Sequence, residues 1–92
     1  MTKLVNSSKT PTNKSILVVD DEEDVLDFLR LYLESLGWKV TTSSSAREAL
    51  QELGQNSYFL VITDIAMPEM DGYEFVGKVR RSESPPQVAL MT

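Results

Sequence analysis

Four short runs rich in apolar and β-branched residues recur along the chain, at residues 15–20, 38–42, 58–63 and 87–92. Runs of this length and composition are typical of strands. The first and third runs show almost no polar alternation, which is typical of strands buried on both faces of a parallel sheet. The pattern therefore predicts four strands that belong to one parallel sheet.

Apolar side chains recur at helical spacing between the first two runs. The spacing predicts a helix over residues 25–36, and Gly37 supplies the left-handed conformation that often follows the last turn of a helix. The stripe that we expect to face the core consists of Val25, Leu26, Leu29, Tyr32, Leu33 and Leu36.

Two more helices are predicted farther along the chain. Ser45 is a suitable N-cap, with Glu48 as its capping-box partner, and this helix is expected to end near Gly54. A third helix opens at Asp71 and Gly72 and ends before two consecutive prolines. The residues of the third helix expected to face inward are Phe75, Val76 and Val79.

The strands and helices alternate with short connections, which implies an α/β fold with helices on the faces of a parallel sheet. Residues 1–14 are mostly polar and lack periodicity, so we expect a flexible leader there. Residues 15–92 then form a single domain, as the total length of 92 residues allows.

Composition limits the chemistry that the chain can perform. It contains neither cysteine nor histidine, so disulfides, thiolate metal sites and imidazole catalysis are excluded for this sequence. The net charge of -5 disfavours binding to nucleic acid or to an anionic membrane. No apolar run approaches the roughly 20 residues that span a bilayer. We expect a soluble, cytoplasmic domain.

Carboxylates gather at the predicted strand ends. Asp20 and Asp21 follow the first strand, Asp64 follows the third, and Thr92 follows the fourth. Groups at the carboxyl ends of parallel strands meet at one edge of the sheet. Close carboxylates repel one another, and a hard cation such as Mg²⁺ (or Mn²⁺) relieves the repulsion. A carboxylate beside Mg²⁺ can attack a phosphoryl group, which makes phosphoryl transfer the expected chemistry.

Two stretches carry a resemblance to a known family: VVDD at residues 18–21 and TDIAMPEMDG at residues 63–72. Together they resemble the receiver domains of two-component response regulators. The resemblance covers residues 15–92 and implies a flavodoxin-like, doubly wound sheet with strand order 2-1-3-4. It also implies a signalling phosphoacceptor rather than an enzyme, with a histidine kinase or a phosphotransfer protein as partner.

The same resemblance assigns roles to individual residues. Asp64 would accept the phosphoryl group, and Asp21 would bind Mg²⁺ directly. Asp20 would hold the ion through a water molecule, and the backbone carbonyl of Ala66 would be a further ligand. Thr92 matches the hydroxyl residue that turns toward the phosphoryl group when the family's switch is thrown.

Family members continue past the position of Thr92 with a fourth helix, a fifth strand that carries a lysine, and a fifth helix. We therefore expect this chain to take up phosphate slowly. We also expect an exposed edge at residues 88–91, and partial exposure of Phe28, Leu29 or Leu33. Such surfaces favour a homodimer or a domain-swapped assembly.

Three alternatives compete with the phosphoacceptor. One is a phosphohydrolase of the haloacid-dehalogenase type, which would carry the phosphoryl group on Asp20 rather than Asp64. Another is a calcium loop at residues 20–24, although the spacing of its acids does not fit an EF-hand. The third is a receiver-like interaction or oligomerisation module that is not phosphorylated, for which Asp64→Asn would leave assembly unchanged. Taken alone, the acids at 20–24 also suit an ordinary helix N-terminus.

Overall fold

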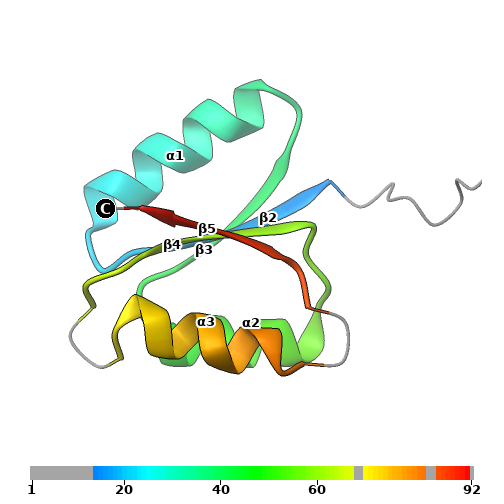
Figure 1. Ribbon diagram of the computed structural model, residues 1–92. Coiled ribbons are helices and arrows are strands. Elements are labelled where there is room, and N and C mark those ends of the chain that lie inside the picture. Colours follow the sequence, from blue (N-terminus) through cyan, green and yellow to red (C-terminus); the bar gives the residue numbers. More distant parts are fainter. Residues whose placement is uncertain (1–13, 68–69, 83–84, 92) are drawn as a thin grey trace, which may run out of the picture.

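A computed structural model describes residues 14–67, 70–82 and 85–91 of the chain. They form a four-stranded parallel sheet with three helices (Figure 1). The strands are β2 (Ser15–Val19), β3 (Lys39–Ser43), β4 (Leu60–Asp64) and β5 (Gln87–Met91). The helices are α1 (Glu23–Ser35), α2 (Ala46–Gln55) and α3 (Gly72–Arg80). The spatial order β3-β2-β4-β5 is the order 2-1-3-4 in chain sequence, which confirms the predicted flavodoxin-like topology.

The sheet lies between two helical layers, with α1 on one face and α2 and α3 on the other (Figure 1). This arrangement explains why β2 is apolar at every position from Ile16 to Val19. Ile16 and Val18 pack on the α1 side, whereas Leu17 and Val19 pack on the side of α2 and α3. All four residues are at most 1% exposed, so β2 is the central buried strand of the molecule.

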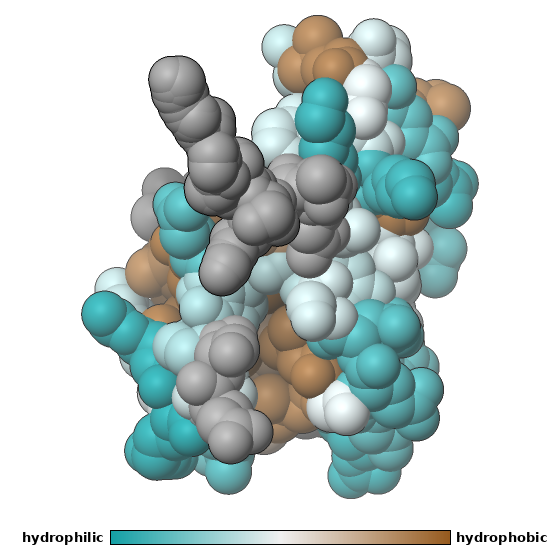
Figure 2. All heavy atoms as spheres, turned by 90° about the vertical axis from the view of Figure 1, so that its right-hand side faces the viewer, coloured by the Kyte–Doolittle hydropathy of each residue, from teal (hydrophilic) through white to brown (hydrophobic). Residues whose placement is uncertain are grey.

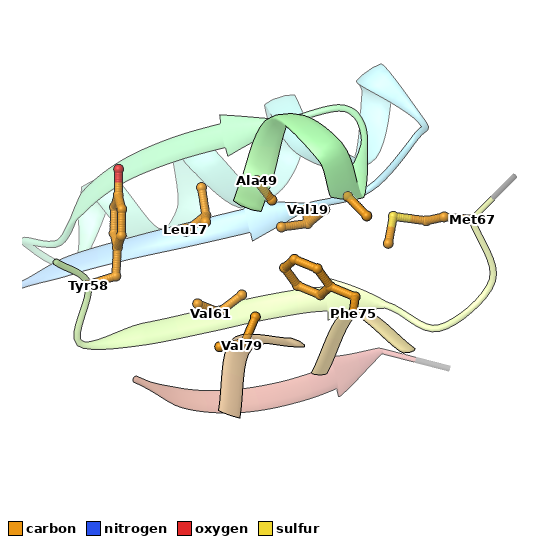
Figure 3. Packing of buried hydrophobic residues seen from close by; sticks show 9 residues of the cluster. Leu17, Val19, Ala49, Tyr58, Val61, Met67, Phe75 and Val79 are labelled. Carbon is orange, nitrogen blue, oxygen red and sulfur yellow. The ribbon is translucent and has the colours of Figure 1, made fainter. Parts of the chain in front are cut away.

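The larger core lies between the sheet and the pair α2 and α3 (Figure 3). Phe75 of α3 is fully buried at its centre, beside Val61 of β4. Met67 belongs to the loop that follows β4, and its side chain points from that loop toward Phe75 and Val19. The core therefore anchors the loop that begins at Asp64.

Local signals for the helix ends agree with the structure, with one difference. Gly37 follows α1 with φ of 98°, the predicted left-handed conformation. The Ser45 hydroxyl accepts a hydrogen bond from the backbone N–H of Glu48 at 3.1 Å. The carboxylate of Glu48 does not return to Ser45 but accepts from the N–H and hydroxyl of Ser44, both at 3.3 Å. The predicted capping box is thus only half formed.

The apolar stripe predicted on α1 is wider than the stripe that is buried. Leu26 is buried, and Leu29 and Leu33 are half-buried against the sheet. Tyr32 and Leu36, which we expected to face the core, are 54% and 59% exposed. The reason is that α1 contacts the sheet through β2 and β3, and Tyr32 and Leu36 lie on a flank turned away from these strands.

Other apolar positions are exposed as well. The large side chains concerned are Phe28, Leu31, Phe59, Tyr73 and Leu90. Val76, expected to face inward, is half-buried because it lies toward the edge strand β5. Figure 2 shows apolar atoms at the top of the molecule, where α1 ends. None of the helices in the described part of the chain is long and apolar enough to cross a membrane.

Candidate functional site

Three carboxylates meet at the carboxyl edge of the sheet. Asp20 and Asp21 follow β2, and Asp64 is the last residue of β4. The two strands are neighbours, with Val19 in register with Thr63, so their ends lie side by side. One oxygen from each of the three carboxylates lies within 4.8 Å of the other two. The structure thus confirms that residues 44 positions apart in sequence form one cluster.

Asp20 is held in place by two hydrogen bonds. Its backbone N–H donates to the carbonyl of Ser43 at 3.2 Å, which joins it to the end of β3. Its Oδ1 accepts from the backbone N–H of Glu22 at 2.9 Å. The side chain is only 6% exposed, whereas the neighbouring Asp21 is exposed. The buried member of the pair is therefore fixed, and the exposed member faces solvent.

Asp64 is half-buried, and its surroundings fix the start of the following loop. Its Oδ1 accepts from the backbone N–H of Ala66 at 3.3 Å. The backbone N–H of Ile65 donates to the carbonyl of Met91 at 3.3 Å, which ties the loop to the end of β5. The residue expected to carry the chemistry therefore sits on a strand that is paired on both sides.

The electrostatics of the cluster are those of uncompensated negative charge. The pKa of Asp20 is raised above its ordinary value, mainly because burial disfavours the charged form, and the charges of Asp64 and Asp21 raise it further. The hydrogen bond from Glu22 acts in the opposite direction. Among the described residues the only ion pair joins Arg30 to Asp27, so no basic side chain from this part of the chain neutralises the cluster.

The donor set of the cluster suits a hard divalent cation. Three carboxylates can each offer an oxygen, and an ion at their centre would relieve the repulsion that raises the pKa of Asp20. Ala66 is exposed and lies two residues after Asp64, near the cluster. Thr92, the predicted switch hydroxyl, lies outside the described residues.

The acidic run after β2 divides into two groups. Asp20 and Asp21 precede α1 and belong to the cluster, whereas Glu23 and Asp24 occupy the first turn of α1. Negative charge in a first turn is favoured by the helix dipole. The run therefore combines a site with an ordinary helix N-terminus.

Comparison with known proteins decides the family. The family model described as the response regulator receiver domain matches residues 16–92. This chain belongs to the response regulator receiver domain family. The match includes Asp20, Asp21 and Asp64. It also includes every described strand except the first residue of β2.

Curated relatives of this receiver are longer than the chain. An uncharacterized 14.6 kDa protein of Leptolyngbya boryana is 45% identical over 85 residues, which cover 89% of this chain and 65% of that protein. The response regulator SaeR of Staphylococcus aureus is 41% identical over 68 residues, which cover 74% of this chain and 29% of SaeR. The receiver thus spans less than two thirds of the length of these relatives.

Solved structures of the response regulator TrrA from Thermotoga maritima share the fold. TrrA in complex with Mg²⁺-BeF is 36% identical with a TM-score of 0.79, and the match covers 84% of this chain and 67% of that chain. TrrA in complex with the histidine kinase ThkA is 37% identical with a TM-score of 0.81, covering 86% and 68%. Both are similar to this receiver in sequence as well as in topology.

Proposed function

We propose that this receiver accepts a phosphoryl group onto Asp64 from the phosphohistidine of a histidine kinase or of a phosphotransfer protein. The observation that carries the proposal is the cluster itself. Asp64 ends the strand next to β2, and its carboxylate lies within 4.8 Å of the carboxylates of Asp20 and Asp21. A half-buried carboxylate at an open strand end is accessible to a donor, and the family in which it occurs is a signalling family.

In the proposed step, a carboxylate oxygen of Asp64 attacks phosphorus and forms a new O–P bond. The P–N bond to the donor's imidazole breaks, and the nitrogen keeps the electron pair and takes up a proton. The product is an acyl phosphate on Asp64. The hydrogen bond from Ala66 N–H to Oδ1 of Asp64 orients the carboxylate for this attack.

We further propose that Asp20, Asp21, Asp64 and the carbonyl of Ala66 hold Mg²⁺ or Mn²⁺. Asp21 would be the direct ligand beside Asp64, and the buried Asp20 would act through water. When bound, the ion offsets negative charge on the phosphoryl oxygens. The Mg²⁺-BeF complex of TrrA supports this assignment by similarity. The hydroxyl of Thr92 is the proposed switch group.

The kinase as partner is supported by the complex of TrrA with the histidine kinase ThkA. Because the phosphoryl group stays on Asp64, the receiver is a signalling phosphoacceptor rather than an enzyme acting on an external substrate.

We place it in the cytoplasm, where it meets kinase and ATP-derived phosphate. With a net charge of -5, it is not expected to bind nucleic acid or a membrane directly.

Intact-mass analysis after exposure to acetyl phosphate and Mg²⁺ tests the proposal. We expect the receiver to gain one phosphoryl group, Asp64→Asn to gain none, and Asp24→Asn, a neighbouring acid outside the cluster, to behave like the parent. Chelation of the cation by EDTA is expected to slow the reaction. A gain that survives Asp64→Asn would exclude Asp64 as the acceptor. The same assay measures whether uptake is slow compared with a longer relative.

A second candidate function, self-association, is favoured by the exposed apolar side chains. Phe28, Leu31, Tyr32 and Leu36 on α1 are each more than half exposed, and β5 lies at the edge of the described sheet. Uncharged edge strands and contiguous apolar side chains favour pairing with a second copy. Light scattering would then give a mass of two chains, and Phe28→Asp would lower it. A mass of one chain at working concentration would rule out this second function.

A further inference from the structure

The first turn of α3 touches the backbone that carries Asp64. Gly72, the first residue of the helix, is buried, and its N–H donates a hydrogen bond to the carbonyl of Ile65. A Cβ placed on Gly72 would lie 2.6 Å from the Cα of Ile65 and 2.8 Å from the carbonyl oxygen of Asp64. Real Cβ atoms essentially never come this close, so the two backbones pack together only because residue 72 has no side chain.

Both sides of this contact are tied down. On the helix side, Asp71 caps α3 by accepting from the N–H of Glu74 at 2.8 Å, and the fully buried Phe75 fixes the same turn in the core. On the strand side, the N–H of Ile65 donates to Met91 of β5, and the carbonyl of Ile65 accepts from Gly72. A side chain at position 72 therefore cannot be accommodated by a free movement of either element.

The strand side is also the site. The Asp64–Ile65 backbone that Gly72 contacts leads directly to Ala66, whose N–H donates to Oδ1 of Asp64. Asp20 directly follows β2 and is held by Ser43 and Glu22, and no such link joins it to α3 among the described residues. Displacement at Gly72 would therefore move Asp64 and Ala66 relative to Asp20, and would change the shape of the cluster rather than the whole domain.

We propose that Gly72 is a positioning residue for the phosphoacceptor site: its missing side chain sets where the Asp64 carboxylate and the Ala66 carbonyl lie relative to Asp20 and Asp21. The inference rests on the proposed function, because it takes these groups as the cation ligands. Other glycines offer the contrast. A Cβ at Gly77, in the same helix, would meet only the Arg81 side chain at 4.0 Å, and a Cβ at Gly54 would meet nothing within 4 Å.

The proposal has a consequence that simple destabilisation lacks. Mg²⁺ demands near-ideal octahedral geometry with short bonds, whereas Ca²⁺ accepts longer bonds and irregular geometry. A shift of several tenths of an ångström between Asp64 and Asp20 therefore weakens Mg²⁺ binding more than Ca²⁺ binding. Changes in groups that orient metal ligands typically cost about 10- to 100-fold in affinity. We expect a loss of this size for Mg²⁺ in Gly72→Ala and a smaller loss for Ca²⁺.

Calorimetric titration of the parent, Gly72→Ala and Gly77→Ala with Mg²⁺ and with Ca²⁺ tests the inference. Gly77→Ala is the matched control, since it adds the same methyl group to the same helix where space is open. Circular dichroism establishes that each variant is folded. If Gly72→Ala is unfolded in buffer, all titrations are repeated in sucrose. Sucrose stabilises the folded state of the parent and of both variants by the same mechanism, exclusion from the protein surface.

The outcomes separate this inference from the proposed function. A parent that binds no Mg²⁺ and takes up no phosphoryl group would refute the proposed function, and the inference with it. A parent that does both, beside a folded Gly72→Ala with parental Mg²⁺ affinity, would overturn the inference alone. Equal losses for Mg²⁺ and Ca²⁺ would also overturn it, because they would indicate general loosening. A selective loss of Mg²⁺ affinity, absent in Gly77→Ala, supports it.

Discussion

Neutralising Asp20 should stabilise the ion-free receiver. Asparagine has nearly the same shape as aspartate and retains an oxygen that can accept the hydrogen bond from Glu22. The substitution therefore removes charge from a buried position while the packing stays the same. The Asp20 carboxylate lacks a basic partner among the described residues and lies beside two other acids.

The size of the effect follows from the separation of the charges. Two unit charges 4.8 Å apart repel by about 3 kcal/mol at an effective dielectric constant of about 20, and by about 1 kcal/mol in bulk water. Asp64 is half-buried and Asp21 is exposed, so solvent and salt screen much of this repulsion. We expect Asp20→Asn to raise the free energy of unfolding by about 1–2 kcal/mol at pH 7 without divalent cations.

The dependence on pH has a definite sign. Because the pKa of Asp20 is raised in the native state, the native state binds the proton more tightly than the unfolded state does. The parent protein therefore loses stability as the pH rises from the ordinary value of 3.8 through the native pKa. Asp20→Asn lacks this loss. The difference in the free energy of unfolding between Asp20→Asn and the parent should be absent at low pH. It should grow as the pH rises from 3.8 to the native pKa of Asp20, and it should stay constant at higher pH.

Urea unfolding in EDTA, followed by fluorescence of the single tryptophan, measures this difference. Trp38 is half-buried and stacks on Phe59 with ring centroids 5.5 Å apart, so its emission reports native packing. Asp24→Asn is the control: it changes the net charge equally but weakens the acidic first turn of α1, so it should destabilise slightly. An Asp20→Asn variant that is no more stable than the parent at pH 7 would refute the repulsion.

Two further predictions concern the core. Phe75→Ala should lower the free energy of unfolding by about 3–5 kcal/mol because the ring is fully buried, whereas Tyr73→Ala, 66% exposed on the same helix, should change it by less than about 0.5 kcal/mol in the same urea assay. Tyr58→Phe should cost about 1 kcal/mol, because the Tyr58 hydroxyl donates to Glu52. Burial and this hydrogen bond raise the pKa of Tyr58 above 10.0, so the parent should lose the stability contributed by this group as the pH rises past 10.0, and the variant should lack that contribution to the loss. A steeper alkaline loss in Tyr58→Phe than in the parent would contradict this.

Sequence predicts the sheet well because its central strand has no polar alternation. Only a strand covered on both faces can hide Ile16 through Val19, and that requirement already implies a parallel sheet with helices on both sides. The glycine at 37, the cap at Ser45 and the helix start at Asp71 and Gly72 are equally local signals, and each appears in the structure as predicted. Glu48 differs because its carboxylate accepts from the backbone N–H and the hydroxyl of Ser44, one residue before the N-cap.

Features that depend on neighbouring elements could not be predicted in this way. The exposure of Tyr32 and Leu36 follows from where α1 sits across the sheet, and helical periodicity shows only that these residues share a flank. Likewise, the motif that contains Gly72 is visible in the sequence. The close contact of Gly72 with the backbone of Ile65, however, depends on how near the start of α3 lies to the end of β4, which the sequence does not show. The cluster of acids could be predicted because the carboxyl ends of parallel strands lie at the same edge of the sheet.

The position of the cluster links the site's chemistry to the stability of the fold. Asp20 follows the most deeply buried strand, and Asp64 ends its neighbour, so the pairing of β2 with β4 keeps the two carboxylates near each other. Their repulsion therefore persists in the native state, and a ligand that neutralises these charges stabilises the folded protein by relieving it. A cation that binds only the folded receiver, at a free concentration of about 100 times its Kd, would add about 2.7 kcal/mol to the free energy of unfolding. In Asp20→Asn the native state has already lost much of that repulsion. The same variant should consequently be more stable without Mg²⁺ and gain less from its addition.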